Sequence, residues 1–197
     1  MDILVVGSVA FDSVETPFGR GDDVLGGSAT YFSTSASFFT GVQLVAVVGD
    51  DFPEEPKEFL RYRGVDLAGL QTRPGDTFRW KGRYGYDLSE AQTLETHLNV
   101  FETFHPQLPE SYRKAEYVFL ANIDPELQLE VLNQVERPKL IACDTMNFWI
   151  EGKREALVRT LGHVDILVIN EAEVRQLADE PNLVKAAEIV RGFGPKT

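Results

Sequence analysis

The stretch Gly26-Gly27-Ser28-Ala29-Thr30-Tyr31-Phe32 places a glycine pair directly before a helical pattern, and the apolar run 44–48 follows that helix. Ser28 is the expected N-cap, and one face of the helix collects Ala29, Phe32, Ser33, Ala36 and Phe39. Glycines at such a position let a ligand approach backbone N–H groups at the positive end of the helix dipole. A tight turn without a ligand is the alternative interpretation of the same pair.

Short apolar runs alternate with amphipathic stretches on both sides of this segment, which is typical of parallel βαβ architecture. The runs predict buried strands at residues 3–6, 44–48, 117–120, 140–143 and 166–169. Helices are predicted at 54–62, 125–134, 150–161, 171–178 and 184–191, with Asp124 as a cap and Pro125 at a first helical position. The expected fold is therefore α/β, a doubly wound, mostly parallel Rossmann-like sheet.

Between residues 70 and 101 the pattern changes to a strand period. Aromatic residues occupy even positions, Phe78, Trp80, Tyr84 and Tyr86, and cations occupy the odd positions Arg79, Lys81 and Arg83. Side chains at alternate positions of a strand point to opposite faces, so this stretch predicts an antiparallel excursion from the main sheet with one wet face. The aromatic side chains either pack across that sheet or offer a face on which a ligand stacks.

The composition excludes several classes of partner. With 19 Lys plus Arg against 31 Asp plus Glu, the formal net charge of the 197 residues is -12, which repels nucleic acid. ATP is not excluded, because helix N-termini and bound Mg2+ act locally. The single Cys143 lies in an apolar run and is expected to be a small buried hydrophobe.

The chain begins directly with an apolar strand pattern, and no run is long enough to span a bilayer. We therefore expect no membrane partner and a cytoplasmic location. The three histidines, His97, His105 and His163, show no metal-ligand spacing with Cys143, so no directly bound metal is expected.

Polar residues that follow buried strands are the candidate ligands, because ligands of open parallel sheets gather beyond the carboxyl ends of the strands. Asp12 follows the first strand, without the Gly-x-Gly-x-x-Gly spacing of a dinucleotide-binding oxidoreductase. It either accepts hydrogen bonds from sugar hydroxyls or forms a turn. Asn170 and Glu173 have the spacing of a helix capping box, which is a structural alternative to any ligand role.

Taken together, these motifs resemble the ribokinase-like (PfkB-type) carbohydrate and nucleoside kinases. Gly26-Gly27, the Ala/Ser-rich helix and Val45-Ala46-Val47-Val48-Gly49-Asp50-Asp51 are similar to the first signature of that family. The segment 117–125 resembles the strand and loop that border the sugar, and Asn170-Glu171-Ala172-Glu173 resembles the Asn-x-x-Glu motif. Asp144-Thr145-Met146-Asn147 is similar to the Asp-x-Asn loop, with its Asn one place late.

The resemblance extends over residues 1–197 and implies a partial ribokinase-like α/β domain, with lid segments at about 14–25 and 70–101. It implies ATP and Mg2+ as cofactors, with Asn170 and Glu173 organising magnesium and phosphate oxygens. The implied ligands of a small-molecule sugar or nucleoside are Asp12, Gly26, Gly27, Tyr31, Asn122 and Asp124. Tyr31 stands where the family commonly has Asn. Its phenol can donate a hydrogen bond, stack on a base or on a sugar face, or pack under the lid.

The implied reaction is transfer of the ATP γ-phosphate to a hydroxymethyl oxygen. In the family the catalytic base and oxyanion donors come from a Gly-Ala-Gly-Asp segment, and residues 1–197 contain no such segment. We therefore expect no catalytic residue in this chain: it carries the substrate-binding half of a longer parent protein, lacks the C-terminal part of the fold, and is inactive alone. A noncatalytic sugar- or nucleoside-binding module is the alternative. A homodimer through the lid is a further implication of the resemblance.

Overall fold

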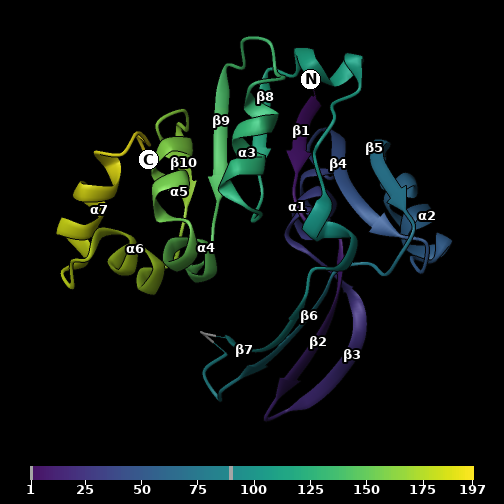
Figure 1. The fold of residues 1–197 in the computed structure, drawn as a ribbon, viewed down its shortest axis with the longest axis horizontal. Coiled ribbons are helices and arrows are strands. Elements are labelled where there is room, and N and C mark those ends of the chain that lie inside the picture. Colours follow the sequence, from purple (N-terminus) through teal and green to yellow (C-terminus); the bar gives the residue numbers. More distant parts are fainter. Residues whose placement is uncertain (1, 89–90) are drawn as a thin grey trace. The chain divides into compact units, whose positions relative to one another are not determined.

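The computed structural model describes residues 2–88 and 91–197, and the chain divides into two compact units (Figure 1). The C-terminal unit comprises residues 1–6 together with 106–197, and the N-terminal unit comprises residues 7–105. Within the described residues, no helix combines the length and the apolar composition needed to cross a membrane.

The C-terminal unit contains four parallel strands, hydrogen-bonded in the order β10-β9-β8-β1. Their bounds are β1 (Asp2–Val6), β8 (Tyr117–Leu120), β9 (Leu140–Asp144) and β10 (Ile166–Val168). Each lies within one residue of its predicted bounds, because each strand has a continuous apolar run that the sequence shows directly. Cys143 on β9 is fully buried, as predicted, and burial raises the pKa of its thiol.

Helices connect and follow these strands. They are η2 (Glu110–Lys114), α3 (Pro125–Leu132), α4 (Asn147–Gly152), α5 (Arg154–Leu161), α6 (Glu171–Ala178) and α7 (Leu183–Arg191). Helix α3 begins as predicted, with Pro125 in its first turn and the Asp124 carboxylate accepting a hydrogen bond from the backbone N–H of Glu126.

The predicted single helix 150–161 is wrong, because the chain breaks it into α4 and α5. Lys153 separates the two, with φ -139° and ψ 36°, outside the helical region. Gly152 is a poor helix former, and the ammonium of Lys153 bonds to the carboxylates of Asp124 and Glu126. These contacts outweigh the continuous helical period of the sequence.

The N-terminal unit contains two sets of strands. Strands β4 (Gly41–Gly49) and β5 (Val65–Arg73) pair in parallel, and β4 is buried over residues 44–48 as predicted. The other set is a four-stranded sheet of β2 (Ala10–Thr16), β3 (Gly19–Gly26), β6 (Arg79–Tyr84) and β7 (Ala91–His97). The remaining elements are α1 (Ser28–Ala36), α2 (Glu54–Tyr62) and η1 (Asn99–Thr103).

The four-stranded sheet has the order β3-β2-β6-β7 and is mixed (Figure 1). Two antiparallel hairpins, β2 with β3 and β6 with β7, join through a parallel pairing of β2 with β6. The expected antiparallel excursion is therefore wrong in part: β6 has the predicted strand period, but it pairs in parallel with a hairpin far away in sequence. Residues 70–73 of the predicted excursion belong to β5 instead.

Helix α1 differs from expectation at both ends. Gly27 is the N-cap, at φ 93° and ψ 142°, and Ser28 is already the first helical residue, so the predicted Ser28 cap is wrong. The helix ends at Ala36, which leaves Phe39 outside it and 87% exposed. The buried face of α1 consists of Ala29, Thr30 and Ser33. These small side chains allow close packing.

Candidate functional site

Asp12 lies directly against the glycine pair. Its Oδ2 accepts a hydrogen bond of 3.4 Å from the backbone N–H of Gly27. A Cβ on Gly26 would lie only 2.1 Å from the same oxygen, and a Cβ on Gly27, at φ 93°, would lie 2.4 Å from the carbonyl oxygen of Ser8. Only glycines permit this approach of a carboxylate to the start of a helix.

Ser8 completes the start of α1, and sequence reasoning missed it. Its hydroxyl accepts a hydrogen bond of 3.0 Å from the N–H of Ser28 and lies 3.1 Å from the Ser28 hydroxyl. Its carbonyl accepts a hydrogen bond of 3.0 Å from the N–H of Ala29. Ser8 therefore caps α1 from outside the helix, a contact 20 residues away in sequence that no local capping motif signals.

Tyr31 lies within electrostatic range of both Asp12 and Tyr84. Burial raises the pKa of Asp12, and the hydrogen bond from Gly27 opposes that rise. Burial also raises the pKa of Tyr31, and the Asp12 charge and Tyr84 raise it further. The structure thus brings the predicted residues Asp12, Gly26, Gly27 and Tyr31 together, and adds Tyr84 of β6.

A polar joint connects β4 to the four-stranded sheet. The carboxylate of Asp51, after β4, accepts hydrogen bonds from the N–H of Thr77 at 2.7 Å and from Arg79 of β6 at 2.9 Å. Burial alone would raise the pKa of Asp51, but the bonds from Thr77 and Arg79 outweigh it and lower the pKa. Arg79 also bonds to Asp23 at 2.7 Å and lies over the ring of Phe11, the neighbour of Asp12. The joint therefore fixes the strand that carries Asp12.

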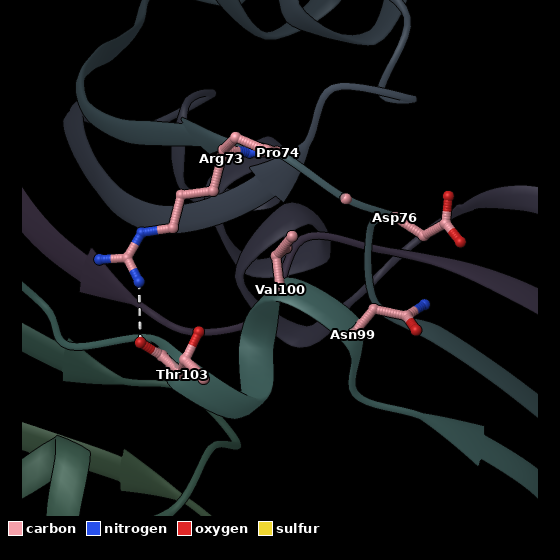
Figure 2. A pocket seen from close by; sticks show the side chains of 7 residues that line it. Arg73, Pro74, Asp76, Asn99, Val100 and Thr103 are labelled. Carbon is pink, nitrogen blue, oxygen red and sulfur yellow. Dashed lines mark hydrogen bonds between the residues drawn. The ribbon is translucent and has the colours of Figure 1, made fainter.

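An open hollow of about 550 Å³ lies beside this joint (Figure 2). Arg73 and Asp76 supply its charges, and Asn99, Val100 and Thr103 of η1 line it. The guanidinium of Arg73 donates to the carbonyl of Thr103 at 2.8 Å, as Figure 2 shows. The Asn99 amide donates to the carbonyl of Thr77 at 2.9 Å. Both contacts anchor η1 to the strands around it.

In the C-terminal unit, Asn122 and Asp124 follow β8, and both have protein partners. Asn122 accepts a hydrogen bond of 3.0 Å from the Trp149 indole. One oxygen of Asp124 caps α3, and the other accepts from Lys153 at 2.6 Å. For Asp124 the geometry is that of a helix cap and an ion pair; its role as a ligand stays a prediction.

Asn170 and Glu173 form the reciprocal capping box of α6. Asn170 Oδ1 accepts from the N–H of Glu173 at 2.9 Å, and Glu173 Oε2 accepts from the N–H of Asn170 at 3.1 Å. Asp144, at the end of β9, lies within electrostatic range of Glu173. Burial first, and then the charge of Glu173, raise the pKa of Asp144 to about 6, against hydrogen bonds from the backbone of Thr145 and Asn122. Burial likewise raises the pKa of Glu173.

These two carboxylates are the residues that could hold a hydrated Mg2+ through water. Among residues 2–88 and 91–197, no group of three or more His, Cys, Asp or Glu could hold a metal ion. Mg2+, however, usually keeps several waters and takes only one or two carboxylates besides phosphate oxygens. Asp144 and Glu173 both hold their negative charge at a cost, and a nearby divalent cation would relieve that cost. The sequence analysis named Asp144 only within the segment that resembles the Asp-x-Asn loop and gave it no role. Its position at the end of the apolar run 140–143 could have marked it as a candidate.

The parallel strands joined by helices and the mixed four-stranded sheet define an α/β protein. Its candidate site is the aspartate beside the glycine pair that opens α1. Comparison with known proteins specifies this class further. The chain is 30% identical over 201 residues to the cytidine kinase of Thermococcus kodakarensis, covering 100% of this chain and 71% of that kinase. The chain belongs to the ribokinase-like (PfkB-type) family of kinases. No family model matches it.

Solved structures show the same fold. The Methanocaldococcus jannaschii nucleoside kinase, an archaeal member of the ribokinase family, matches with a TM-score of 0.70 and 16% identity, over 95% of this chain and 67% of that one. The Arabidopsis thaliana ribokinase complexed with ribose and ATP matches with a TM-score of 0.70 and 16% identity, over 98% of this chain and 69% of that one. The expected α/β, ribokinase-like fold class is confirmed.

Proposed function

We propose that the protein binds a nucleoside or sugar for phosphorylation of its hydroxymethyl group by ATP. The observation that carries this proposal is the contact of Asp12 with Gly26 and Gly27 at the start of α1. A carboxylate accepts hydrogen bonds from vicinal hydroxyls, and charge-assisted bonds of this kind are the strong ones. The nucleoside and sugar substrates named for the relatives support the same choice.

Each part of the site has a separate task in this proposal. Asp12 orients the substrate through its hydroxyls, Tyr31 lies beside it, and the N-terminus of α1 provides a positive field. Asn122 and Asp124 are further candidate ligands for the substrate. The predicted lid segments 14–25 and 70–101 overlap the four-stranded sheet of β2, β3, β6 and β7. Closure of this sheet over the substrate would exclude water from the reacting groups.

The nucleotide part of the proposal rests on the C-terminal unit. ATP supplies the phosphoryl group, and Mg2+ offsets the negative charge of its phosphates. Glu173, Asn170 and Asp144 would hold the hydrated ion and orient phosphate oxygens. The complex of the Arabidopsis ribokinase with ATP supports ATP as the donor.

Calorimetric titration with cytidine, adenosine and ribose tests the substrate site. We expect saturable binding to the wild-type protein, and at least tenfold weaker binding by Asp12→Asn, because an amide accepts fewer hydrogen bonds and carries no charge. Asp22→Asn is the matched control, since Asp22 is an exposed residue of β3 paired with Arg20. Equal affinity of Asp12→Asn and wild type for every ligand would contradict the proposed site.

A phosphoryl-transfer assay with ATP and Mg2+ tests the reaction itself. The Gly-Ala-Gly-Asp segment that supplies the base in the family does not occur among the 197 residues, so we expect these residues to bind substrate without steady turnover. Turnover by the chain would contradict that expectation and support the kinase function. Substrate binding without any response to ATP would instead favour the noncatalytic binding module.

We further propose that the protein dimerises through the four-stranded sheet. Its edge strands β3 and β7 are largely exposed, and exposed edges pair readily with other chains. Light scattering coupled to size exclusion measures the mass. A monomeric mass at every accessible concentration would contradict the proposed dimer. It would not contradict the proposed substrate site.

A further inference from the structure

The hairpin of β2 and β3 contains a β-bulge directly beyond Asp12. The register of the two strands shifts there, and two residues of β3, Asp22 and Asp23, lie opposite the single residue Ser13 of β2. A bulge adds one residue to one strand, so it changes which side chains of that strand share a face with their partners. Bulges often lie beside functional sites, where they re-aim a side chain. The position of this bulge therefore matters for Asp12.

The register beyond the bulge decides which residues of β3 share the face of Asp12. Paired residues of antiparallel strands point to the same face, and successive residues point to opposite faces. Asp12 pairs with Val24, and Gly26 lies on the face of Asp12 because it pairs with Ala10. Without the bulge, the register of the pairs near the hairpin turn would continue along the strands. It would place Asp23 directly opposite Asp12, with like charges facing each other, and would turn Gly26 to the other face.

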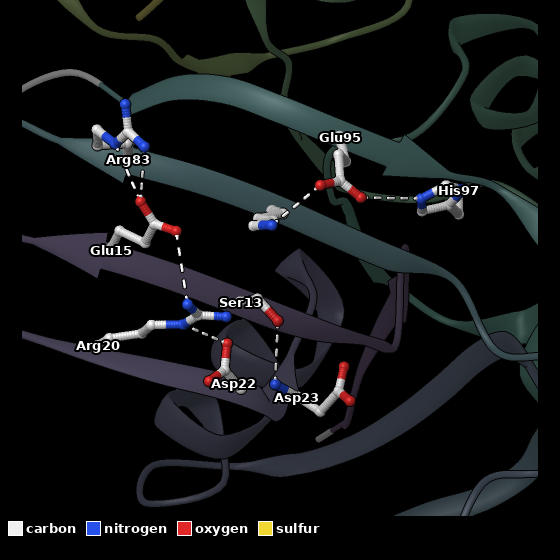
Figure 3. Close-up of polar contacts among 9 residues, drawn as sticks. Ser13, Glu15, Arg20, Asp22, Asp23, Arg83, Glu95 and His97 are labelled. Carbon is white, nitrogen blue, oxygen red and sulfur yellow. Dashed lines mark hydrogen bonds and ion pairs between the residues drawn. The ribbon is translucent and has the colours of Figure 1, made fainter.

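Both bulge residues turn their carboxylates to the face opposite to Asp12. The Asp22 carboxylate pairs with Arg20 at 2.7 Å, as Figure 3 shows. The Asp23 carboxylate pairs with Arg79 of β6 at 2.7 Å. By strand alternation, Arg20 and Arg79 both lie on the face away from Asp12. Consecutive residues of a regular strand would point to opposite faces, so the bulge keeps both negative charges away from Asp12.

The bulge is bonded to its neighbours through Asp23. This residue has φ 47°, in the left-handed region, which aspartate adopts more readily than most residues do. Its backbone N–H donates to the Ser13 hydroxyl at 3.1 Å (Figure 3). Its partner Arg79 also bonds to Asp51, after β4, at 2.9 Å. The left-handed backbone and these contacts together hold the shifted register.

We propose that Asp23 is a positioning residue for the proposed substrate carboxylate, because its left-handed backbone sets the register that brings Asp12 and Gly26 to one face. The proposal rests on the proposed function, since Asp23 acts only through Asp12. The missing side chain of Gly26 makes room for the Asp12 carboxylate, which accepts from the N–H of Gly27. A slip of one residue in register would break this contact while every residue of the site remained present.

Substitutions at position 23 test the role of its backbone. Glycine adopts the left-handed region freely, alanine adopts it less readily, and the β-branched valine strongly disfavours it. Calorimetric titration measures the affinity for whichever of cytidine, adenosine and ribose the wild-type protein binds. We expect Asp23→Gly to bind like wild type although it loses the bond to Arg79. Asp23→Ala should bind more weakly, and Asp23→Val about tenfold or more weakly, as expected for Asp12→Asn.

The order of affinities separates the backbone of Asp23 from its carboxylate. All three variants lack the carboxylate, so equal losses of affinity would assign the effect to the lost bond with Arg79 and overturn the proposal. If Asp23→Val does not fold, the comparison of Asp23→Gly with Asp23→Ala decides in the same way.

Asp179→Val is the matched control for stability. Asp179 is also an exposed aspartate in the left-handed region, at φ 51°, but it ends α6 in the C-terminal unit. Both valine variants should lower the thermal midpoint, because each holds a β-branched residue in a disfavoured conformation. Only Asp23→Val should weaken substrate binding. An equal loss of affinity in Asp179→Val would assign the effect to lower stability and overturn the proposal.

The NMR signal of the Gly27 amide reports the position of Asp12 directly, because that amide donates to its carboxylate. Without ligand, Asp23→Val should shift the Gly27 proton signal in the same direction as Asp12→Asn does, and Asp23→Gly should leave it in place. An unchanged Gly27 signal in Asp23→Val would overturn the inference. Binding that is still weakened by Asp12→Asn would then leave the proposed function standing. Absence of saturable binding of cytidine, adenosine and ribose by the wild-type protein would overturn both.

Discussion

Gly26 is the residue on which the position of Asp12 depends most directly. Its backbone does not need a left-handed conformation, so alanine is excluded only by the Asp12 carboxylate, 2.1 Å from the position of the new Cβ. We expect Gly26→Ala to displace that carboxylate, to weaken nucleoside binding at least tenfold, and to cost about 1–3 kcal/mol of stability through overpacking. Calorimetric titration and urea unfolding measure the two effects.

Gly21→Ala is the control on the same strand, because a Cβ at position 21 would meet Val24 at 3.4 Å, an ordinary contact. It should bind nucleoside as wild type does. Unchanged affinity in Gly26→Ala would show that Asp12 does not need its observed position.

Asp144 makes the pH dependence of stability testable. Burial, and then the charge of Glu173, raise its pKa in the folded protein from 3.8 to about 6. The folded state therefore holds this proton more tightly than the unfolded state, and the free energy of unfolding falls as pH rises from about 4 to about 6. Above that window the ionised carboxylate costs about 3 kcal/mol of folding free energy.

Asp144→Asn, which resembles the protonated acid, should thus stabilise the protein at pH 7.5 by up to about 3 kcal/mol. The gain should shrink as pH falls toward 4.5, because wild-type Asp144 then becomes protonated. Urea unfolding at several pH values measures this. Asp165→Asn should act in the opposite direction, because Lys196 and the backbone N–H of Ile141 lower the pKa of Asp165. A gain for Asp144→Asn that does not depend on pH would contradict the assignment.

At the scale of single residues, the sequence predicts which residues lie near the site better than it predicts their partners. Asp12 and the glycine pair could be expected together because both belong to short polar segments beside buried strands. The cap that Ser8 provides could not be predicted, because two segments 20 residues apart must meet in the folded chain to form it. Asp51 and Arg79 pair across 28 residues for the same reason.

At the scale of the element, helix α6 separates capping from ligand binding. The capping box tolerates glutamine as well as glutamate at its third helical position. Glu173→Gln should therefore keep the bond to Asn170, and it should be no less stable than wild type because burial disfavours the Glu173 charge. Asn170→Ala, which removes the cap, should cost about 1 kcal/mol.

Binding of ATP then distinguishes the two roles of Glu173. If its carboxylate organises Mg2+, Glu173→Gln should weaken Mg2+-dependent ATP binding at least tenfold, measured by thermal shift at millimolar nucleotide. Equal Mg2+-dependent shifts for Glu173→Gln and wild type would leave Glu173 as a cap alone.

The helices show where periodicity fails as a predictor. Residues 54–62 and 171–178 have the predicted bounds, because amphipathic patterns and clear end signals agree there. The break at Lys153 was missed because the two carboxylates that bond to it belong to another helix and its cap. The early end of α1 was missed because Phe39 continues the apolar period beyond the last helical turn.

At the scale of the molecule, the α/β class follows from the alternation of apolar runs and helices, but the pairing within the four-stranded sheet does not. Two hairpins separated by α1, β4, α2 and β5 in sequence meet in parallel. The strand period of residues 79–84 says nothing about which neighbour the strand pairs with. Long-range pairings of this kind depend on the whole fold.

The division into two units predicts two separate ligand footprints. A ligand that binds only the folded state at one hundred times its Kd stabilises that state by about 2.7 kcal/mol, which slows exchange through unfolding about a hundredfold. In hydrogen exchange, a nucleoside should therefore protect amides of the N-terminal unit around Asp12, Gly27 and β6. Millimolar Mg2+ and ATP should protect amides of the C-terminal unit around Asp144 and Glu173. Protection by both ligands of the same unit alone would contradict the assignment of substrate and phosphate to different residues, because each proposed contact set lies within one unit.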